Sequence, residues 1–303
     1  MENFKIGLQL YSVRDEMEKD VYTTLKKVKE IGYDYVEFAG FYNVEAVEMK
    51  KMLDEIGLSA ISVHQNAQGF LEKADYWIDY YKTLGITNVA IPWMKKDNLL
   101  VENKELFENT MSDFKKMSNI LKENGITLSY HNHEFEFETT GGKYILDNLY
   151  DTLDEETLKT QLDLCWVKYG GEDPVKYINK YAKRCPTVHF KDFTCQKLNA
   201  GAAYALIDND GKAKNQREVD QFKFKPLGDG LQDFAPIVEA VKKSVAQYAI
   251  VEQDGGFEEL SSIDSVAKSR KYLKDNFGLW YFMLWALPIP TSLFLKRLGE
   301  KLT

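Results

Sequence analysis

The feature that most restricts the fold of this chain is a phrase that occurs four times in its first half. The four copies read KEIGYDYVEF, DEIGLSAISVH, KTLGITNVAIP and KENGITLSYHN. In each copy a segment of helical period with charged or polar residues in its last turn ends at a glycine, and a short β-branched or aromatic run follows. Glycine directly after a helix adopts the left-handed conformation that ends it. The repeat therefore predicts helix–glycine–strand units in series.

The rest of the chain continues this alternation, which predicts eight strands and eight helices. The strands are expected near 5–13, 35–39, 59–66, 88–93, 127–135, 159–166, 187–193 and 248–254. The helices are expected near 21–31, 44–56, 71–84, 102–124, 144–155, 174–184, 233–244 and 262–277. Eight alternations favour a closed barrel, and the first strand lacks the Gly-rich turn of nucleotide-binding sheets. The predicted fold class is an α/β protein with a (β/α)8 TIM barrel.

Two segments do not follow this rhythm. Residues 194–232 are polar and rich in turn residues, and they follow a strand on the face where barrel enzymes bind substrate, so we expect a lid or substrate loop. We assign residues 1–278 to the barrel and 279–303 to a separate C-terminal tail. Residues 279–295 carry no charge. Pro288 and Pro290 interrupt a run that is short of the roughly 20 apolar residues of a membrane helix. We therefore expect the tail to be buried against the barrel or against a second subunit of a homo-oligomer rather than to anchor the protein in a membrane.

Composition restricts the partners and the compartment. The 303 residues include 39 basic and 47 acidic ones, and the net charge of −8 argues against a nucleic-acid partner. A small polar or metal-bridged substrate is expected instead. The three cysteines have no paired spacing, and the N-terminus MENFKIGLQLYSVRDEMEKD lacks the pattern of a signal peptide. We therefore expect a cytoplasmic protein.

The chemistry is expected at the carboxyl ends of the strands, facing the barrel axis. Side chains alternate along a strand, and one face of each predicted strand is apolar enough to pack against helices. The opposite face of six strands carries polar or charged residues: Glu37, Ser62, His64, Asn66, His131, His133, Gln161, Asp163, His189, Lys191, Glu252 and Asp254. All four histidines of the chain belong to this set. Its convergence on one rim predicts a functional site.

Four of these residues form the predicted metal site. A lone histidine at a strand end is more often structural, but two imidazoles and two carboxylates from four consecutive strands suit one divalent ion. The ligands are expected to be His131, Asp163, His189 and Glu252, with Mn²⁺, Co²⁺, Zn²⁺, Mg²⁺ or Fe²⁺ as the ion. His133 is either a further ligand or a residue that contacts the ligands and orients them. The nearby acidic residues Glu134, Glu136 and Glu138 are expected to face solvent.

The motifs IGLQLYSVRD, ISVH, LSYHNHEFEF, QLDLCW, VHFKD, PLGDG and AIVEQD occur in this order along the chain. Together they resemble the sugar phosphate isomerase/epimerase family of the xylose-isomerase-like TIM-barrel superfamily, over residues 4–278. The resemblance implies one divalent metal held by a Glu, an Asp, a His and a second Glu. Asp163, His189 and Glu252 match the last three places. The first place departs from the family, because His131 stands where a glutamate is common.

The resemblance also implies roles for other residues. Glu252 is the expected base, with His131 or Lys191 as its partner, and Lys191 either acts as the acid or stabilises negative charge. Glu37, His64, His133 and Trp93 are expected to contact the sugar. Trp166 lies in the outward register of its predicted strand and is expected to belong to the core.

The function implied is a metal-dependent isomerase or epimerase that acts on a keto-sugar or cyclitol through an enediolate. The alternative is a lyase or dehydratase that uses the same site on an inosose or keto-sugar and expels a hydroxyl group. A non-catalytic sugar-binding barrel and a relative of the apurinic endonucleases rank below both.

Overall fold

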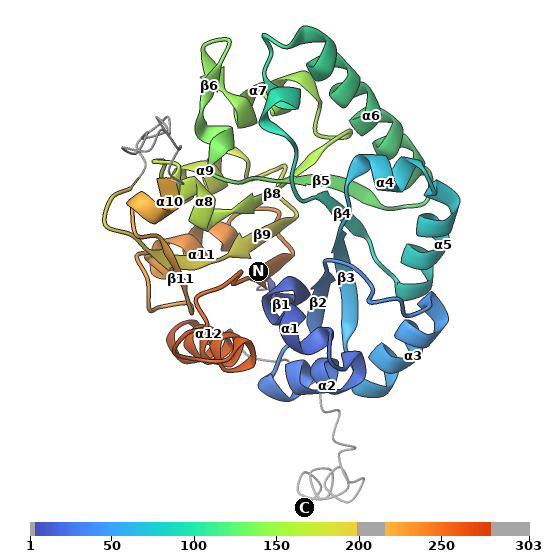
Figure 1. Cartoon of the computed structure of the whole chain (residues 1–303), viewed down its shortest axis with the longest axis vertical. Helices are drawn as coiled ribbons and strands as arrows, with labels where there is room; N and C mark the ends of the chain where they lie inside the picture. The colour runs from blue at the N-terminus through green and yellow to red at the C-terminus, as the bar shows by residue number, and fades with distance from the viewer. Residues whose placement is uncertain (1–3, 199–215, 280–303) are drawn as a thin grey trace, which may run out of the picture.

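The barrel predicted from the sequence is confirmed. The computed structural model describes residues 4–198 and 216–279. Eight parallel strands follow one another around a closed barrel in chain order, and the last strand pairs with the first (Figure 1). The strands are β1 (Lys5–Gln9), β2 (Tyr35–Phe38), β3 (Ser59–His64), β4 (Asn88–Ile91), β5 (Thr127–His131), β8 (Lys159–Asp163), β9 (Thr187–Phe190) and β12 (Tyr248–Val251).

Helices surround this barrel at the positions that the repeat predicts (Figure 1). The eight expected helices are α2 (Val21–Ile31), α3 (Ala46–Ile56), α5 (Ala74–Leu84), α6 (Lys104–Glu123), α7 (Ile145–Thr152), α9 (Pro174–Lys180), α11 (Phe234–Lys242) and α12 (Ser262–Phe277). The glycines of the four phrases, Gly32, Gly57, Gly85 and Gly125, all have φ between 74° and 105°. They end their helices in the left-handed conformation as expected.

The alternation of side chains is also confirmed. Leu8, Val36 and Val63 are fully buried among the apolar residues that join the strands to the helices. The neighbouring polar residues Gln9 and Glu37 are equally buried but hydrogen-bond to each other. Polar side chains therefore fill the barrel axis and apolar ones the layer around it.

Several strands are shorter than predicted, because polar side chains begin a new element at their carboxyl ends. Gln9 accepts a hydrogen bond from the amide of Tyr11, and the 3₁₀ turn η1 (Leu10–Val13) and α1 (Arg14–Met17) follow. The carboxylate of Asp163 starts α8 (Leu164–Tyr169) where the strand was expected to continue. After Phe190 the chain enters a separate hairpin, in which β10 (Asp192–Thr194) pairs antiparallel with β11 (Lys223–Lys225). β1 and β8 thus end where side chains satisfy the free backbone amides.

The remaining short elements lie in the connections. They are α4 (Ala67–Leu71), η2 (Lys96–Leu99), η3 (Phe135–Phe137), the two-stranded hairpin of β6 (Thr139–Thr140) and β7 (Lys143–Tyr144), and α10 (Gln216–Val219). The predicted substrate loop at 194–232 contains α10 and β11, and its residues 199–215 lie outside the described part of the chain.

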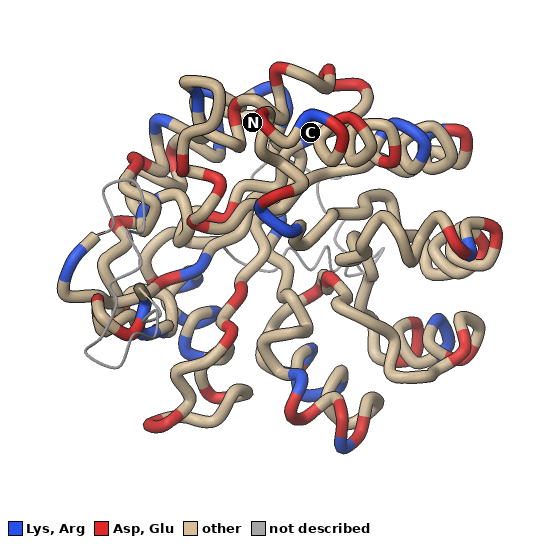
Figure 2. Tube along the Cα trace, turned by 45° about the horizontal axis from the view of Figure 1, so that its top comes forward, with Lys and Arg blue, Asp and Glu red and all other residues tan. Residues whose placement is uncertain are grey.

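The predictions for the C-terminal tail fall almost entirely on residues 280–303, outside the described residues. Leu279 is 3% exposed, and its carbonyl accepts a hydrogen bond from Arg270 of α12. Within residues 4–198 and 216–279, the helices are too short or too polar to span a membrane. Figure 2 shows that lysines and arginines alternate with acidic residues along the outer helices, so charge of both signs is spread around the barrel.

Candidate active site

A buried polar network fills the barrel axis beneath the site, and Glu37 is its centre. The two carboxylate oxygens of Glu37 accept hydrogen bonds from Gln9 Nε2 at 2.8 Å and Gln161 Nε2 at 2.7 Å. Nε2 of His64 and Nε2 of His189 lie 3.0 and 2.8 Å from Glu37 Oε1. Burial favours the neutral acid, but these imidazoles hold the pKa of Glu37 well below its usual value. Glu37 is therefore a buried anion that orients two histidines.

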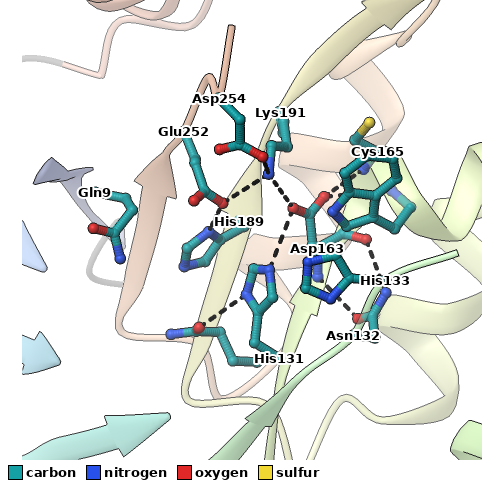
Figure 3. A network of polar contacts seen from close by, with 12 residues as sticks. Gln9, His131, Asn132, His133, Asp163, Cys165, His189, Lys191, Glu252 and Asp254 are labelled. Atoms are coloured by element: carbon teal, nitrogen blue, oxygen red, sulfur yellow. Dashed lines mark hydrogen bonds and ion pairs between the residues drawn. The ribbon is translucent and has the colours of Figure 1, made fainter. Parts of the chain in front are cut away.

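The four predicted metal ligands come together at the carboxyl end of the barrel (Figure 3). One ligand atom from each of His131, Asp163, His189 and Glu252 lies within 4.8 Å of the others, and all four residues are buried. His131 Nε2 is 3.6 Å from Asp163 Oδ2, and His189 Nδ1 is 2.9 Å from Glu252 Oε2. Three strand ends and the residue that follows β12 thus present two nitrogens and two oxygens to one small volume.

The protonation of the two histidines differs. Burial lowers the pKa of His131 well below its usual value, which leaves it neutral with a free lone pair. Burial also opposes the charge of His189, but the carboxylates of Glu37 and Glu252 outweigh it and raise its pKa to about 10. A metal would have to displace that proton.

This donor set fits a divalent ion. Mixed imidazole and carboxylate ligation suits Zn²⁺, Mn²⁺, Fe²⁺ and Mg²⁺ in varying degree. Among the described residues, the buried Nε2 of His189 has no partner in hydrogen-bonding geometry, despite the proximity of Glu37. His64, His131 and His189 form a second set of converging ligand atoms, which shares two residues with the first. One ion would therefore use one set or the other.

Asp163 is fixed by its surroundings. The side-chain amide of Asn132 bonds both the backbone amide and the carbonyl of Asp163, at 3.0 and 3.3 Å. Asp163 Oδ1 accepts hydrogen bonds from the amides of Cys165 and Trp166 at the start of α8. This leaves Oδ2 to face the site.

Lys191 enters the site from the residue after β9 and is 1% exposed. Its ammonium lies 3.1 Å from Asp163 Oδ2, 3.0 Å from Glu252 Oε2 and 2.7 Å from Asp254 Oδ2 (Figure 3). Burial disfavours its charge, but the three carboxylates raise its pKa well above the usual value, so Lys191 is a cation. The prediction assigned Asp254 no role, although strand alternation had placed it on the polar face.

The two tryptophans differ in burial. Trp166 is 1% exposed and packs in an apolar core cluster, which confirms the prediction of a core position. Its direction differs from the predicted one, because the strand ends at Asp163 and the first turn of α8 carries the indole toward the site. Its ring lies 5.2 Å from Lys191 Nζ and stacks on His133 at 5.6 Å. Trp93, the expected substrate wall, follows β4 and is 52% exposed. It is not part of the buried cluster.

The prediction for Glu136 was wrong. It is fully buried, and it accepts hydrogen bonds from the Tyr130 hydroxyl at 2.6 Å and the His133 amide at 2.8 Å. Burial raises its pKa to about 8. Its carboxyl group therefore fixes the turn that carries His133. Burial of the His133 imidazole lowers the pKa of His133 to about 3.

The other two acidic residues of this segment reach basic partners and are half-buried. Glu138 pairs with Lys96, and Glu134 pairs with Arg217 of α10. The guanidinium of Arg217 lies 4.2 Å from the centre of the Trp166 ring. The described end of the 194–232 segment thus contacts residues beside the site, which only its tertiary position reveals.

A model of the xylose isomerase-like TIM barrel matches residues 25–275, most of the chain. The chain belongs to the xylose isomerase-like TIM barrel family. This confirms the resemblance drawn from the motifs.

The individual proteins that resemble this chain share less than a third of its residues over the aligned length. The inosose dehydratase of Clostridium perfringens is 28% identical over 184 residues, which are 60% of this chain and 59% of that protein. The chain thus spans about three fifths of this relative. A sugar phosphate isomerase/epimerase from Parabacteroides distasonis has a TM-score of 0.71 at 22% identity, over 92% of this chain and 96% of that one. A xylose isomerase-like protein from Mycobacterium smegmatis in complex with magnesium has a TM-score of 0.62 at 16% identity, over 90% and 97%. At these identities the solved structures establish the fold alone.

Proposed function

We propose that this protein is a divalent-metal-dependent dehydratase of an inosose or a related keto-sugar. One observation carries the proposal: the cluster of His131, Asp163, His189 and Glu252 contains two carboxylates, and only one of them is free to move a proton. Asp163 is bound through both oxygens, to α8 and to Lys191. The hydrogen bonds of Glu252 with His189 and Lys191 both use Oε2. Oε1 of Glu252 is therefore available to a substrate.

A site in which only one carboxylate can transfer a proton favours elimination over epimerisation. Epimerisation with two carboxylates requires a base on each face of the substrate, and His131 replaces the first of them. In elimination, Glu252 takes the proton next to the carbonyl, and the C–H electrons form an enediolate. The β C–O bond then breaks, and Glu252 returns the proton to the departing hydroxyl as water.

The other residues have supporting roles in this reaction. A bound metal would polarise the substrate carbonyl and make the neighbouring proton more acidic. The raised pKa of Lys191 makes it a poor acid, so its ammonium would stabilise the negative charge of the enediolate instead. Lys191 and His189 hold the pKa of Glu252 well below its usual value despite burial, so the base is ionised. His64 and His133 would contact substrate hydroxyls, and Glu37, buried beneath the site, would orient His64 and His189.

The similarity to inosose dehydratases supports this order of the two candidates, whereas the sequence alone favoured the isomerase. The test is incubation of the Mn²⁺-loaded protein with inososes and keto-sugars in D₂O. Loss of one water, followed by mass spectrometry, is expected. Deuterium incorporation at the α carbon without loss of water would favour the isomerase and contradict the proposal. Glu252→Gln should abolish both reactions while the far-UV circular dichroism stays unchanged.

A further inference from the structure

The ammonium of Lys191 and a metal ion would need the same oxygen atoms. Asp163 Oδ2 and Glu252 Oε2 belong to residues of the ligand cluster, and both accept hydrogen bonds from Lys191 Nζ, at 3.1 and 3.0 Å. These oxygens also lie nearest to the cluster's imidazoles, 3.6 Å from His131 Nε2 and 2.9 Å from His189 Nδ1. A dication among these ligands would stand within a few ångströms of a buried positive charge, which repels it strongly.

The chain offers this ammonium a second partner beyond the ligand cluster. Asp254 Oδ2 lies 2.7 Å from Lys191 Nζ, nearer than either cluster oxygen. Asp254 is not a member of the ligand set, and within the described residues its buried Oδ1 has no hydrogen-bond partner. Asp254 can therefore hold the ammonium through both oxygens after Asp163 and Glu252 release it.

The surroundings of the ammonium permit such a movement. The rings of Trp166 and Phe224 also border the ammonium, with their centres 5.2 and 5.4 Å from Lys191 Nζ. Aromatic faces attract a cation without fixing its position.

We propose that Lys191 is a built-in countercation of the metal site and that Asp254 is its receiving carboxylate. Without metal, the ammonium neutralises Asp163 and Glu252 and keeps their side chains together. When a divalent ion binds, Lys191 transfers its hydrogen bonds to Asp254. The pair thus sets the affinity for the metal, and it leaves a cation at the edge of the substrate site. This inference rests on the metal dependence of the proposed function.

The first test measures Mn²⁺ binding to the purified full-length protein by isothermal titration calorimetry. Lys191→Met removes the competing charge and should tighten Mn²⁺ binding by about tenfold or more. The metal-free variant should be less stable, because its buried carboxylates lose their cation, and Mn²⁺ should raise its Tm more than that of the unchanged protein. Lys29→Met on α2, which removes the ion pair of Lys29 with Asp34, is the control and should not alter the affinity. Equal affinities of Lys191→Met and the unchanged protein would overturn the proposal.

The second test begins with Asp254 and leaves Lys191 in place. Asp254→Asn keeps the shape of the side chain but weakens its hold on the ammonium, so Mn²⁺ binding should weaken by about tenfold. The double variant Lys191→Met/Asp254→Asn should bind Mn²⁺ as Lys191→Met does, because Asp254 acts through the lysine. An equal loss with and without the lysine would mean that Asp254 acts only as a general negative charge, which would contradict its receiving role.

The same titrations separate this inference from the proposed function. Absence of Mn²⁺ binding in all variants would overturn both. Normal binding with no effect of Lys191→Met would overturn the countercation alone. Dehydration of substrate by metal-free protein would overturn the metal-dependent function, whereas the affinities of the variants would still decide the role of Lys191.

Discussion

At the residue scale, single side chains of this protein serve the fold and the site together. Asp163 begins α8 through Oδ1 and presents Oδ2 to Lys191 and His131. Glu37 joins two glutamines to two histidines across the barrel axis. Such residues have to be changed conservatively if their two contributions are to be measured separately.

Asp163 permits this separation. Asp163→Asn keeps an oxygen for the amides of Cys165 and Trp166 but removes the charge, so we expect a native Tm within a few degrees and a loss of metal affinity of about tenfold or more. Asp163→Ala also removes the helix cap and should lower the free energy of unfolding by about 1 kcal/mol more. Urea denaturation and Mn²⁺ titration of both variants measure the two effects. Equal stability of the two variants would show that the cap contributes nothing.

Glu136 predicts a pH dependence of stability. Its pKa is about 8 in the folded protein, against an ordinary value of 4.5, so between these values the folded state retains a proton that the unfolded state has lost. The free energy of unfolding therefore falls as the pH rises from 4.5 to 8, by an amount on the order of 4 kcal/mol. Glu136→Gln, which remains neutral, should lack this contribution. Urea denaturation of both proteins across this range tests it, and parallel pH profiles would refute the buried acid.

At the element scale, the connection after β9 depends on a carboxylate that is not part of the site. Asp192 accepts hydrogen bonds from the backbone amides of Phe193, Gly228, Gly230 and Gln232. The segment PLGDG thus wraps around Asp192 and leads to the Asp233 cap of α11. A side chain in this turn would displace the anion that organises it.

Gly230 is the most sensitive position of this turn. A Cβ atom there would lie 2.1 Å from Asp192 Oδ1 and 2.5 Å from the Phe193 carbonyl oxygen. Gly230→Ala should therefore lower the free energy of unfolding by about 2 kcal/mol or more. Gly255→Ala is a matched control, because its nearest neighbour is 3.7 Å away and its φ is not in the left-handed region. Thermal denaturation compares the two, and equal Tm values would contradict the account of this turn.

At the scale of the whole molecule, the site joins neighbouring strands of the barrel through buried charges. Its ligands come from β5, β8, β9 and the end of β12, so a metal ion would link four neighbouring strands. Ligand binding to the folded state alone raises the free energy of unfolding with ligand concentration.

Metal removal should therefore lower the stability of the whole barrel. At a Mn²⁺ concentration about 100 times Kd, we expect a stabilisation of about 2.7 kcal/mol relative to protein treated with EDTA. The corresponding rise in Tm should be a single cooperative shift, seen by circular dichroism and by tryptophan fluorescence. His189→Ala provides the control, since a variant without a ligand should lose most of the shift. An equal shift in that variant would place the ion elsewhere.

The sequence by itself determined the barrel, the four helix-ending glycines and the membership of the ligand cluster. These depend on local patterns, because glycine after a helix and alternation along a strand act over a few residues. His131, Asp163, His189 and Glu252 were identifiable since consecutive parallel strands end on the same rim.

Only the tertiary structure decided the strand ends, the inward position of Trp166, the burial of Glu136 and the triple pairing of Lys191. Lys191 meets carboxylates that lie far away in the chain. The other three features depend on side-chain contacts within a turn, which the period of a strand or a helix does not describe. Asp163 ended its strand because its carboxylate caps a helix, and that turn carried Trp166 to the site. Glu136 is buried because Tyr130 and the His133 amide satisfy its oxygens. Periodicity cannot report such partners, because burial of a polar side chain is tolerated only where the fold supplies its hydrogen bonds.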